Sequence, residues 1–336
     1  FLTIPLALGL LPRPSAAPAP GDPVVLKLAT VAPDGSAWMN VLEKMQKEVY
    51  LRTRGRVSFK FYPGGIAGEE PTVLEKIRYG QLHGAGLTGI GMGQILPEVR
   101  IMELPFSIRT YEEYDYVLER LRPHFEKGFE EKGFVVLAWA EAGFANFFSK
   151  KPIRSLEELR STKVWHRTGD PKIEILFQEL GIKPVPVPLS DVLTSIQTGL
   201  LETVYVSPLA LIALQWFPHL DYAFRTPIYN IQASVVVDRR AWERISPEDR
   251  TLVRDLCNAN IRGLVESTRK DNAESEQVLR QKGIEFLSPD EAQERAIAEA
   301  RERIAAAMTG RLFDAALLAR FRDLLAEARG PRGAPR

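Results

Sequence analysis

Two short stretches in the middle of the chain carry side chains that could hold a small molecule. Trp165, His166 and Arg167 stand at the end of the apolar run KVW, and Tyr205 and Ser207 stand at the end of the run TVYV. Aromatic rings can stack on an apolar ligand, whereas guanidinium and hydroxyl groups can bind its polar atoms. Both runs are short, apolar and flanked by turn residues, as buried strands are. We therefore expect a ligand site where these two strands end.

The segments between these stretches have the start and stop signals of helices. Asp170 and Pro171 precede a run with apolar residues at helical spacing, and Gly181 follows it. Ser190 precedes a second run, which stops at Gly199. Strand, helix, strand, helix and strand in this order build a mostly parallel sheet, and ligands of open sheets bind beyond the carboxyl ends of the strands. The predicted fold thus brings both stretches to one edge of a sheet.

Composition and charge exclude several classes of protein. The chain has 336 residues, of which 45% are hydrophobic and 26% are charged, with 44 basic and 43 acidic side chains. This balance leaves no basic field for nucleic acid, and the length is typical of two domains of moderate size. A single cysteine, Cys257, lies in a helical run and reads as a buried apolar side chain. Because the four histidines lack metal-ligand spacing and no phosphate-binding motif is present, we expect neither a metal nor a cofactor.

The remaining chain alternates between predicted strands and helices. A charged amphipathic pattern predicts a helix over 111–132. A second helix is predicted to start at Ser246-Pro247 and to run to about Lys282, with Gly263 as its only strong breaker. The chain is expected to cross into a second lobe near 140–147 and to return after 229. The predicted strands cover 24–30, 57–62, 83–93, 134–143, 163–165, 183–187, 203–206, 232–238 and 283–288. The other predicted helices end near 54 or cover 71–81, 171–180, 191–198, 209–217 and the segment after Ser288.

The N-terminal segment has the composition of a secretory signal. It reads FLTIPLALGLLPRPSAAPAPGDP, an apolar run followed by small residues and prolines. The run is too short to span a bilayer, and no cysteine is available there for a lipid anchor. We expect an exported, non-lipidated periplasmic protein; the alternative is a disordered Pro/Ala tail.

Taken together, these pieces resemble the substrate-binding proteins of TRAP transporters, the DctP family. The resemblance rests on four segments, which are KLAT at 27–30, YPGGIAGEEPTVLEKIRYGQLHGAGLT at 62–88, KKPIRSLEELRSTKVW at 150–165 and LGIKPVPVPLSDVLTSIQTGLLE at 180–202. It implies an α/β fold of two lobes, like that of periplasmic binding proteins, with mixed sheets, hinge strands and one long helix that spans both lobes. It also implies that a small organic ligand is trapped between the lobes and delivered to TRAP membrane permease subunits.

The resemblance also sets expected boundaries. Residues 1–22 are the remnant of the signal and a linker. The first lobe comprises 23–141 and 229–265, the second comprises 142–228 and 266–329, and 330–336 form a disordered tail.

The sequence departs from the family at the residue that usually binds the ligand. Most members have an arginine at the position of Trp165, where it pairs with a carboxylate of the ligand, and the usual asparagine falls at Val206 or Ser207. Tryptophan cannot form a bidentate pair with a carboxylate. The resemblance therefore implies an apolar or amphipathic ligand, and it suggests a sub-family that works with a TPR-repeat accessory protein. The candidate ligand-binding residues are Trp165, Arg167, Tyr205, Ser207, Thr88, Trp38, Phe147 and Trp216.

Several alternatives remain open from the sequence. The chain could bind a carboxylate or keto acid through Arg167 or another arginine. It could be an exported α/β enzyme, for which His166 and Asp170 near one strand end are the candidates, although no Ser or Cys motif accompanies them. It could also report to a membrane receptor rather than to a permease. Trp165 and Trp216 could be packing residues, and Arg167 a solvated loop residue.

Overall fold

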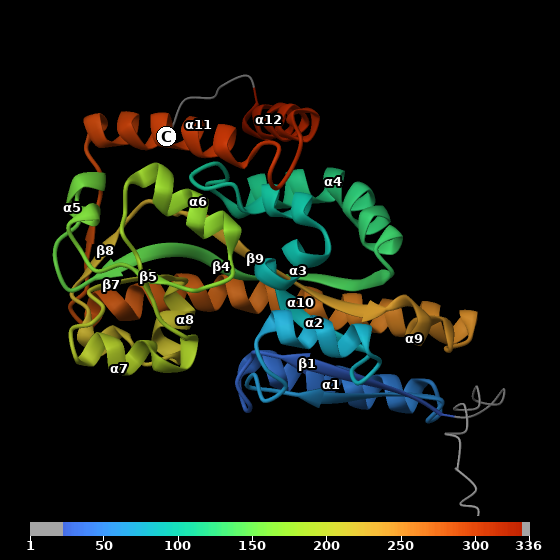
Figure 1. Ribbon diagram of the computed structural model, residues 1–336. Helices are drawn as coiled ribbons and strands as arrows, with labels where there is room; N and C mark the ends of the chain where they lie inside the picture. The colour runs from blue at the N-terminus through green and yellow to red at the C-terminus, as the bar shows by residue number, and fades with distance from the viewer. Residues whose placement is uncertain (1–22, 331–336) are drawn as a thin grey trace, which may run out of the picture.

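Two long strands, β4 (Phe134–Ser149) and β9 (Tyr229–Asp238), pair antiparallel at the centre of the molecule (Figure 1). The computed structural model describes residues 23–330. The strands of the main sheet lie in the order β10-β8-β4-β9-β3-β1-β2, and β7 pairs with the far end of β4. Because β4 and β9 contribute to both halves of this sheet, they are the strands that connect the two lobes.

The first lobe is built on three parallel strands, β1 (Val24–Thr30), β2 (Val57–Tyr62) and β3 (Gly84–Thr88). Buried and exposed residues alternate along the start of β1, as expected of a strand with one covered face. The helices of this lobe are α1 (Ala37–Arg52), α2 (Glu70–Arg78), α3 (Gly89–Ile95), the 3₁₀ segment η1 (Pro97–Glu103) and α4 (Tyr111–Glu131).

The second lobe contains the central stretch of the sequence. Its strands are β5 (Trp165–His166), β6 (Val185–Pro186), β7 (Thr203–Val206), β8 (Tyr222–Phe224) and β10 (Glu285–Leu287). Strands β5 and β6 pair parallel, and Val164 bridges to Thr203 in the same sense, but β7 runs antiparallel to β4. The sheet is therefore mixed. The helices are α5 (Leu156–Arg160), α6 (Pro171–Leu180), η2 (Leu189–Asp191), α7 (Val192–Gln197), α8 (Pro208–Ala213), η3 (Phe217–His219) and α11 (Glu291–Met308).

The predicted long helix is present and spans both lobes. Helix α10 (Pro247–Gln281) follows the short α9 (Arg239–Glu243) and begins at Ser246, whose hydroxyl accepts a hydrogen bond from Asp249 N. It packs against α1 in the first lobe and against α8 in the second, and in Figure 1 it runs below β4 and above α1. The last helix, α12 (Ala315–Arg329), packs against α4.

Three local predictions were wrong. The strand predicted over 83–93 ends at Thr88, because the Thr88 hydroxyl accepts from Ile90 N and starts α3. Ser190 does not cap a helix, since η2 precedes α7 there and Asp191 takes the N-cap position without a side-chain hydrogen bond. The helix predicted over 209–217 stops at Ala213, because Gln215 adopts φ 58°, which a helix cannot contain.

Other signals were confirmed. Asp170 accepts from Lys172 N at the start of α6, and Gly181 closes the helix with φ 67° in the left-handed region. The helix predicted after Ser288 is α11, which begins at Glu291 with Asp290 as its N-cap. The expected signal segment and the C-terminal tail beyond 330 lie outside the described residues.

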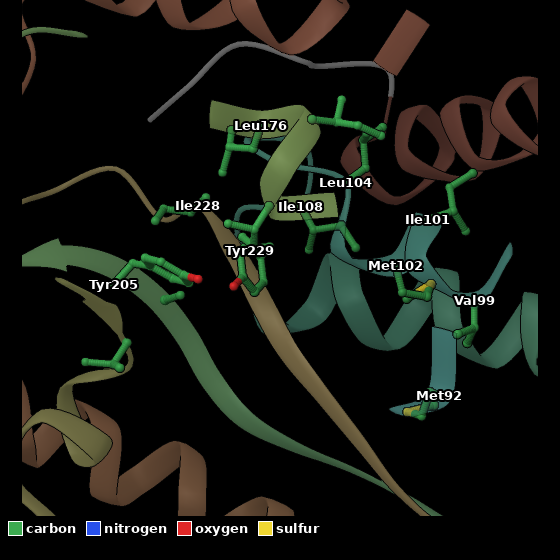
Figure 2. Close-up of a cluster of buried hydrophobic side chains, with 14 of the residues drawn as sticks. Met92, Val99, Ile101, Met102, Leu104, Ile108, Leu176, Tyr205, Ile228 and Tyr229 are labelled. Atoms are coloured by element: carbon green, nitrogen blue, oxygen red, sulfur yellow. The ribbon is translucent and has the colours of Figure 1, made fainter. Parts of the chain in front are cut away.

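One buried hydrophobic cluster extends through both lobes. Figure 2 shows Leu104 and Ile108, which follow η1, near Leu176 of α6, with Tyr205 of β7 and Tyr229 of β9 beside them. A second cluster lies between the first-lobe strands, α1 and α10. The shared cluster means that α6 contacts the first lobe at the segment that carries η1.

Candidate ligand site between the lobes

A buried arginine lies at the carboxyl end of β3. The side chain of Arg100 in η1 is 4% exposed, and a Cβ added to Gly89 would meet its Nη1 atom at 2.2 Å. Gly89 is the first residue of α3, directly after β3. Only glycine therefore leaves room for the guanidinium against this turn, which is where an open sheet binds its ligands.

The partner of this arginine comes from the other lobe. Arg100 Nη2 donates to both carboxylate oxygens of Asp170, at 2.7 Å each. Asp170 lies beyond the end of β5, and its carboxylate also accepts from Lys172 N. Burial opposes ionisation of this carboxyl, but Arg100 and Lys172 outweigh it and hold the pKa of Asp170 below its usual value. The ion pair thus joins strand ends of the two lobes.

A second ion pair lies beside the first. Lys172 Nζ contacts Glu103 Oε2 at 3.1 Å and lies 3.0 Å from the ring centre of Tyr229. Glu103 also pairs with Arg100 Nη1 at 2.8 Å and accepts from Gln232 N of β9 at 3.0 Å. Burial lowers the pKa of Lys172 to about 8, against the opposing effect of Glu103. We call Arg100, Glu103, Asp170 and Lys172 the interlobe charge cluster; each lobe contributes one cation and one anion.

A more exposed ion pair also connects the lobes. Arg167 Nη2 contacts Glu69 Oε2 at 2.7 Å, and the two side chains are 17% and 58% exposed. The adjacent Glu70 is buried and accepts from Thr88 N, from the Thr88 hydroxyl and from Gly91 N. Glu69 and Glu70 begin α2, so this helix start faces the second-lobe stretch that carries Arg167.

Aromatic rings form a wall on the second-lobe side. Trp165 stacks on Tyr205 with ring centres 5.1 Å apart and an interplanar angle of 27°, and Trp216 meets Trp165 edge-on at 5.5 Å. Phe147 of β4 lies opposite Tyr205 in the strand register, and the centres of the two rings are 6.3 Å apart. Figure 2 shows the hydroxyl of Tyr205 directed toward Tyr229. We call Trp165, Tyr205, Trp216 and Phe147 the aromatic wall.

The structure brings most of the predicted site residues together. The four residues of the aromatic wall form a chain of ring contacts, in which Phe147 meets Tyr205, Tyr205 meets Trp165 and Trp165 meets Trp216; Arg167 N donates to the Tyr205 hydroxyl at 3.5 Å. All four wall residues are buried, and the Trp165 indole donates to the carbonyl of Val187. Trp165 is therefore held by a hydrogen bond as well as by stacking.

The other predicted residues have local roles or lie elsewhere. Ser207 is buried and caps α8 by accepting from Ala210 N, and Thr88 caps α3 and donates to Glu70. Trp38 lies on α1 and packs, half-buried, against the cluster between the first-lobe strands and α10. Trp38 thus belongs to a different core from the aromatic wall.

The sequence reasoning missed the charged residues at the centre of the site. Arg100 and Glu103 interrupt the apolar run VRIMELPF, and Lys172 lies on the buried side of α6. Charged side chains are almost never fully buried unless they are paired, so these interruptions were a signal. The pairing itself could not be inferred, because Asp170 lies 70 positions from Arg100.

The two residues considered for catalysis are engaged in other contacts. Asp170 is engaged by Arg100, and His166 Nε2 lies 3.9 Å from Glu174 Oε1. Burial lowers the pKa of His166, although Glu174 and Asp170 oppose the shift. Burial also raises the pKa of the Cys257 thiol to about 12, which makes it a poor nucleophile at neutral pH. Within 23–330, no three His, Cys, Asp or Glu side chains gather where they could hold a metal ion.

Two α/β lobes joined by crossing strands, with charged and aromatic side chains of both lobes meeting at the strand ends, define the class of two-lobed solute-binding proteins. The family model of the bacterial extracellular solute-binding proteins, family 7 (DctP), matches residues 28–310. The chain belongs to this family, whose members are receptors for solutes rather than enzymes. In the described part of the chain, no helix is both long and apolar enough to cross a membrane.

Related proteins agree with this assignment. A solute-binding protein of Chromohalobacter salexigens is 24% identical over 227 residues, which are 67% of this chain and 66% of the relative. A TRAP periplasmic solute-binding protein of Desulfovibrio salexigens with bound orotic acid superposes with a TM-score of 0.81 at 18% identity, over 91% of this chain and 99% of that one. A receptor of Bordetella pertussis that binds pyroglutamic acid gives a TM-score of 0.81 at 17% identity, over 90% and 99%. The predicted two-lobed fold is confirmed.

Proposed function

We propose that this protein is the extracytoplasmic receptor of a TRAP-type transporter and traps a small apolar or amphipathic solute between its lobes. The observation that carries the proposal is the interlobe charge cluster beside the aromatic wall. The charge cluster combines residues of both lobes that an open receptor would separate, and the aromatic wall lies on the second-lobe side. A solute that touches both lobes would therefore shift the population toward the closed state.

The preference for an apolar or amphipathic solute follows from the ion pairs that the cations of the site already form. The three cations of this region, Arg100, Lys172 and Arg167, each contact a carboxylate of the protein. Trp165 occupies the position where the family usually has its carboxylate-binding arginine. A solute carboxylate buried here would have to compete with the protein's own carboxylates, and an uncompensated buried charge is costly. Aromatic rings and a few hydroxyls favour a solute with a substantial apolar body.

We propose the lobe boundaries that the sequence suggested, 23–141 with 229–265 and 142–228 with 266–329. Support comes from the crossing strands β4 and β9 and from α10, which contacts helices of both lobes. The packing of α12 against α4 adds a contact between the C-terminal helix and the first lobe. This contact would have to persist or slide when the lobes open.

We further propose that the protein acts in the periplasm without catalysis and delivers its solute to TRAP permease subunits. The N-terminal composition and the family support export. A TPR-repeat accessory protein is proposed as an additional partner, on the strength of the tryptophan at 165 and of the stretch SPLALIALQW.

The receptor function can be tested without knowing the chemical identity of the solute. Protein purified from its host is unfolded, freed of small molecules and refolded, and its radius of gyration is measured by small-angle X-ray scattering. We expect the stripped protein to be larger than the protein as purified, and the released small-molecule fraction to restore the compact form. Equal radii in all three samples would contradict the proposal.

A further inference from the structure

Asp170 of the protein itself pairs with Arg100, the cation that a carboxylate ligand would need. Arg100 lies against the turn after β3, and Asp170 lies beyond the end of β5, so their contact spans the two edges at which an open sheet binds ligands. The Nη2 atom of Arg100 donates hydrogen bonds to both carboxylate oxygens of Asp170, and Nη1 forms an ion pair with Glu103. Both ends of the guanidinium are therefore engaged.

We propose that Asp170 is a specificity-determining residue: by neutralising Arg100 from the opposite lobe, it makes the closed site favour solutes without a carboxylate and reject small organic acids. This inference rests on the proposed receptor function and names the class of solute that the same site accepts.

The charges of the cluster explain why an acid is disfavoured. Two cations, Arg100 and Lys172, face two anions, Glu103 and Asp170, and all four side chains are at most 5% exposed. Within this cluster, an acid could enter only by displacing Asp170 from Arg100 or by remaining without a cation. Either event leaves a carboxylate buried and uncompensated, which is strongly unfavourable. A neutral solute leaves the four charges as they are.

Asp170 also has a structural role, and the test must separate the two. Its carboxylate caps α6 by accepting from Lys172 N. Asparagine caps helices as well as aspartate does and has nearly the same volume. Asp170→Asn therefore removes the negative charge and keeps the cap. A purely structural role would change stability without changing which of two matched solutes binds better.

The experiment compares a small acid with its neutral amide. Hexanoate and hexanamide are titrated calorimetrically into the wild-type protein and into Asp170→Asn, both stripped of small molecules. We expect the wild type to bind hexanoate no more tightly than hexanamide. We expect Asp170→Asn to bind hexanoate about tenfold or more tighter than the wild type does, because Arg100 is then free to form charge-assisted hydrogen bonds.

Asp249→Asn is the matched control. Asp249 is also buried and pairs with an arginine, Arg56, at 2.7 Å, but this pair lies at the start of α10. Its replacement should leave the order of the two probes unchanged. If Asp170→Asn does not fold, Asp170→Ser, which also provides an N-cap, takes its place.

Two results would overturn the inference. One is a wild type that prefers hexanoate over hexanamide. The other is a folded Asp170 variant with no gain in affinity for hexanoate, including the case in which it binds neither probe. A wild type that binds neither probe, with a variant that binds hexanoate, supports the inference. Failure of the receptor function is distinct, since it appears in the scattering experiment as the absence of any solute-dependent compaction.

Discussion

Replacing Lys172 with methionine should remove a pH dependence from the stability of this protein. Lys172 is 1% exposed, and burial lowers its pKa from 10.5 to about 8 in the folded state. Between these two values the unfolded chain holds a proton on this lysine that the folded chain has lost. The free energy of unfolding of the wild type therefore rises with pH through this window, because the unfolded state binds more protons.

The magnitude follows from the two pKa values. A group shifted in this way contributes little change below pH 8 and at most about 1.4 kcal/mol per pH unit above it. Between pH 7 and pH 9 the contribution of Lys172 increases by about 1.4 kcal/mol, and by about 2 kcal/mol at pH 9.5. Methionine has a similar length and no charge, so the variant lacks this contribution. Glu103 keeps Arg100 and the amide of Gln232 as partners in the variant.

The assay is urea unfolding of both proteins at matched pH values between 7 and 9.5, followed by circular dichroism. Other groups titrate in the same range, including Cys257, whose pKa is raised by burial, but they are common to both proteins and cancel in the difference. We expect the stability of the wild type minus that of Lys172→Met to grow by about 1.4 kcal/mol from pH 7 to pH 9. A difference that stays constant or shrinks with pH would show that burial does not depress the pKa of Lys172.

Two further substitutions test the packing of the site. Gly89→Ala should lower the stability by about 1–3 kcal/mol, because the new Cβ would overlap Arg100 and Glu103. Gly263→Ala, within α10 and facing open space, is the control and should raise the stability by about 1 kcal/mol. Equal effects of the two substitutions in thermal unfolding would contradict the close approach of Arg100 to Gly89. Trp165→Ala should cost about 3–5 kcal/mol, since the ring is buried and stacked on Tyr205, and a loss below about 1 kcal/mol in urea unfolding would show that the aromatic wall does not stabilise the fold.

Much of the fold could be predicted because its signals are local. Ser246 and Pro247 are a start signal for α10, and Asp170 and Gly181 are the start and stop signals of α6. The prediction for 83–93 failed because Thr88 can serve equally as the last residue of a strand or as a helix cap. The tertiary context, in which Glu70 accepts from Thr88 N and Gly91 N, selects the cap.

The candidate site could be predicted only where neighbours in the sheet are set by strand order. Trp165 and Tyr205 lie on β5 and β7, which are bridged through Val164 and Thr203, so their proximity could be predicted from the order of the strands. Trp38 was misplaced because its helix turns it toward α10, and a single helix turn does not reveal which face is covered. The interlobe charge cluster depends on η1 meeting α6, a contact that no local pattern encodes.

The chemical identity of the natural solute is the decisive observation for the proposed selectivity. Native mass spectrometry of the mature protein, purified gently from its host, followed by denaturation and analysis of the released small molecules, would give it. We expect a neutral or predominantly apolar molecule, consistent with three cations already paired to carboxylates of the protein and with the adjoining aromatic wall. A small, highly polar acid, such as a dicarboxylate or a uronate, would contradict this expectation and would assign Arg100 or Arg167 to the ligand.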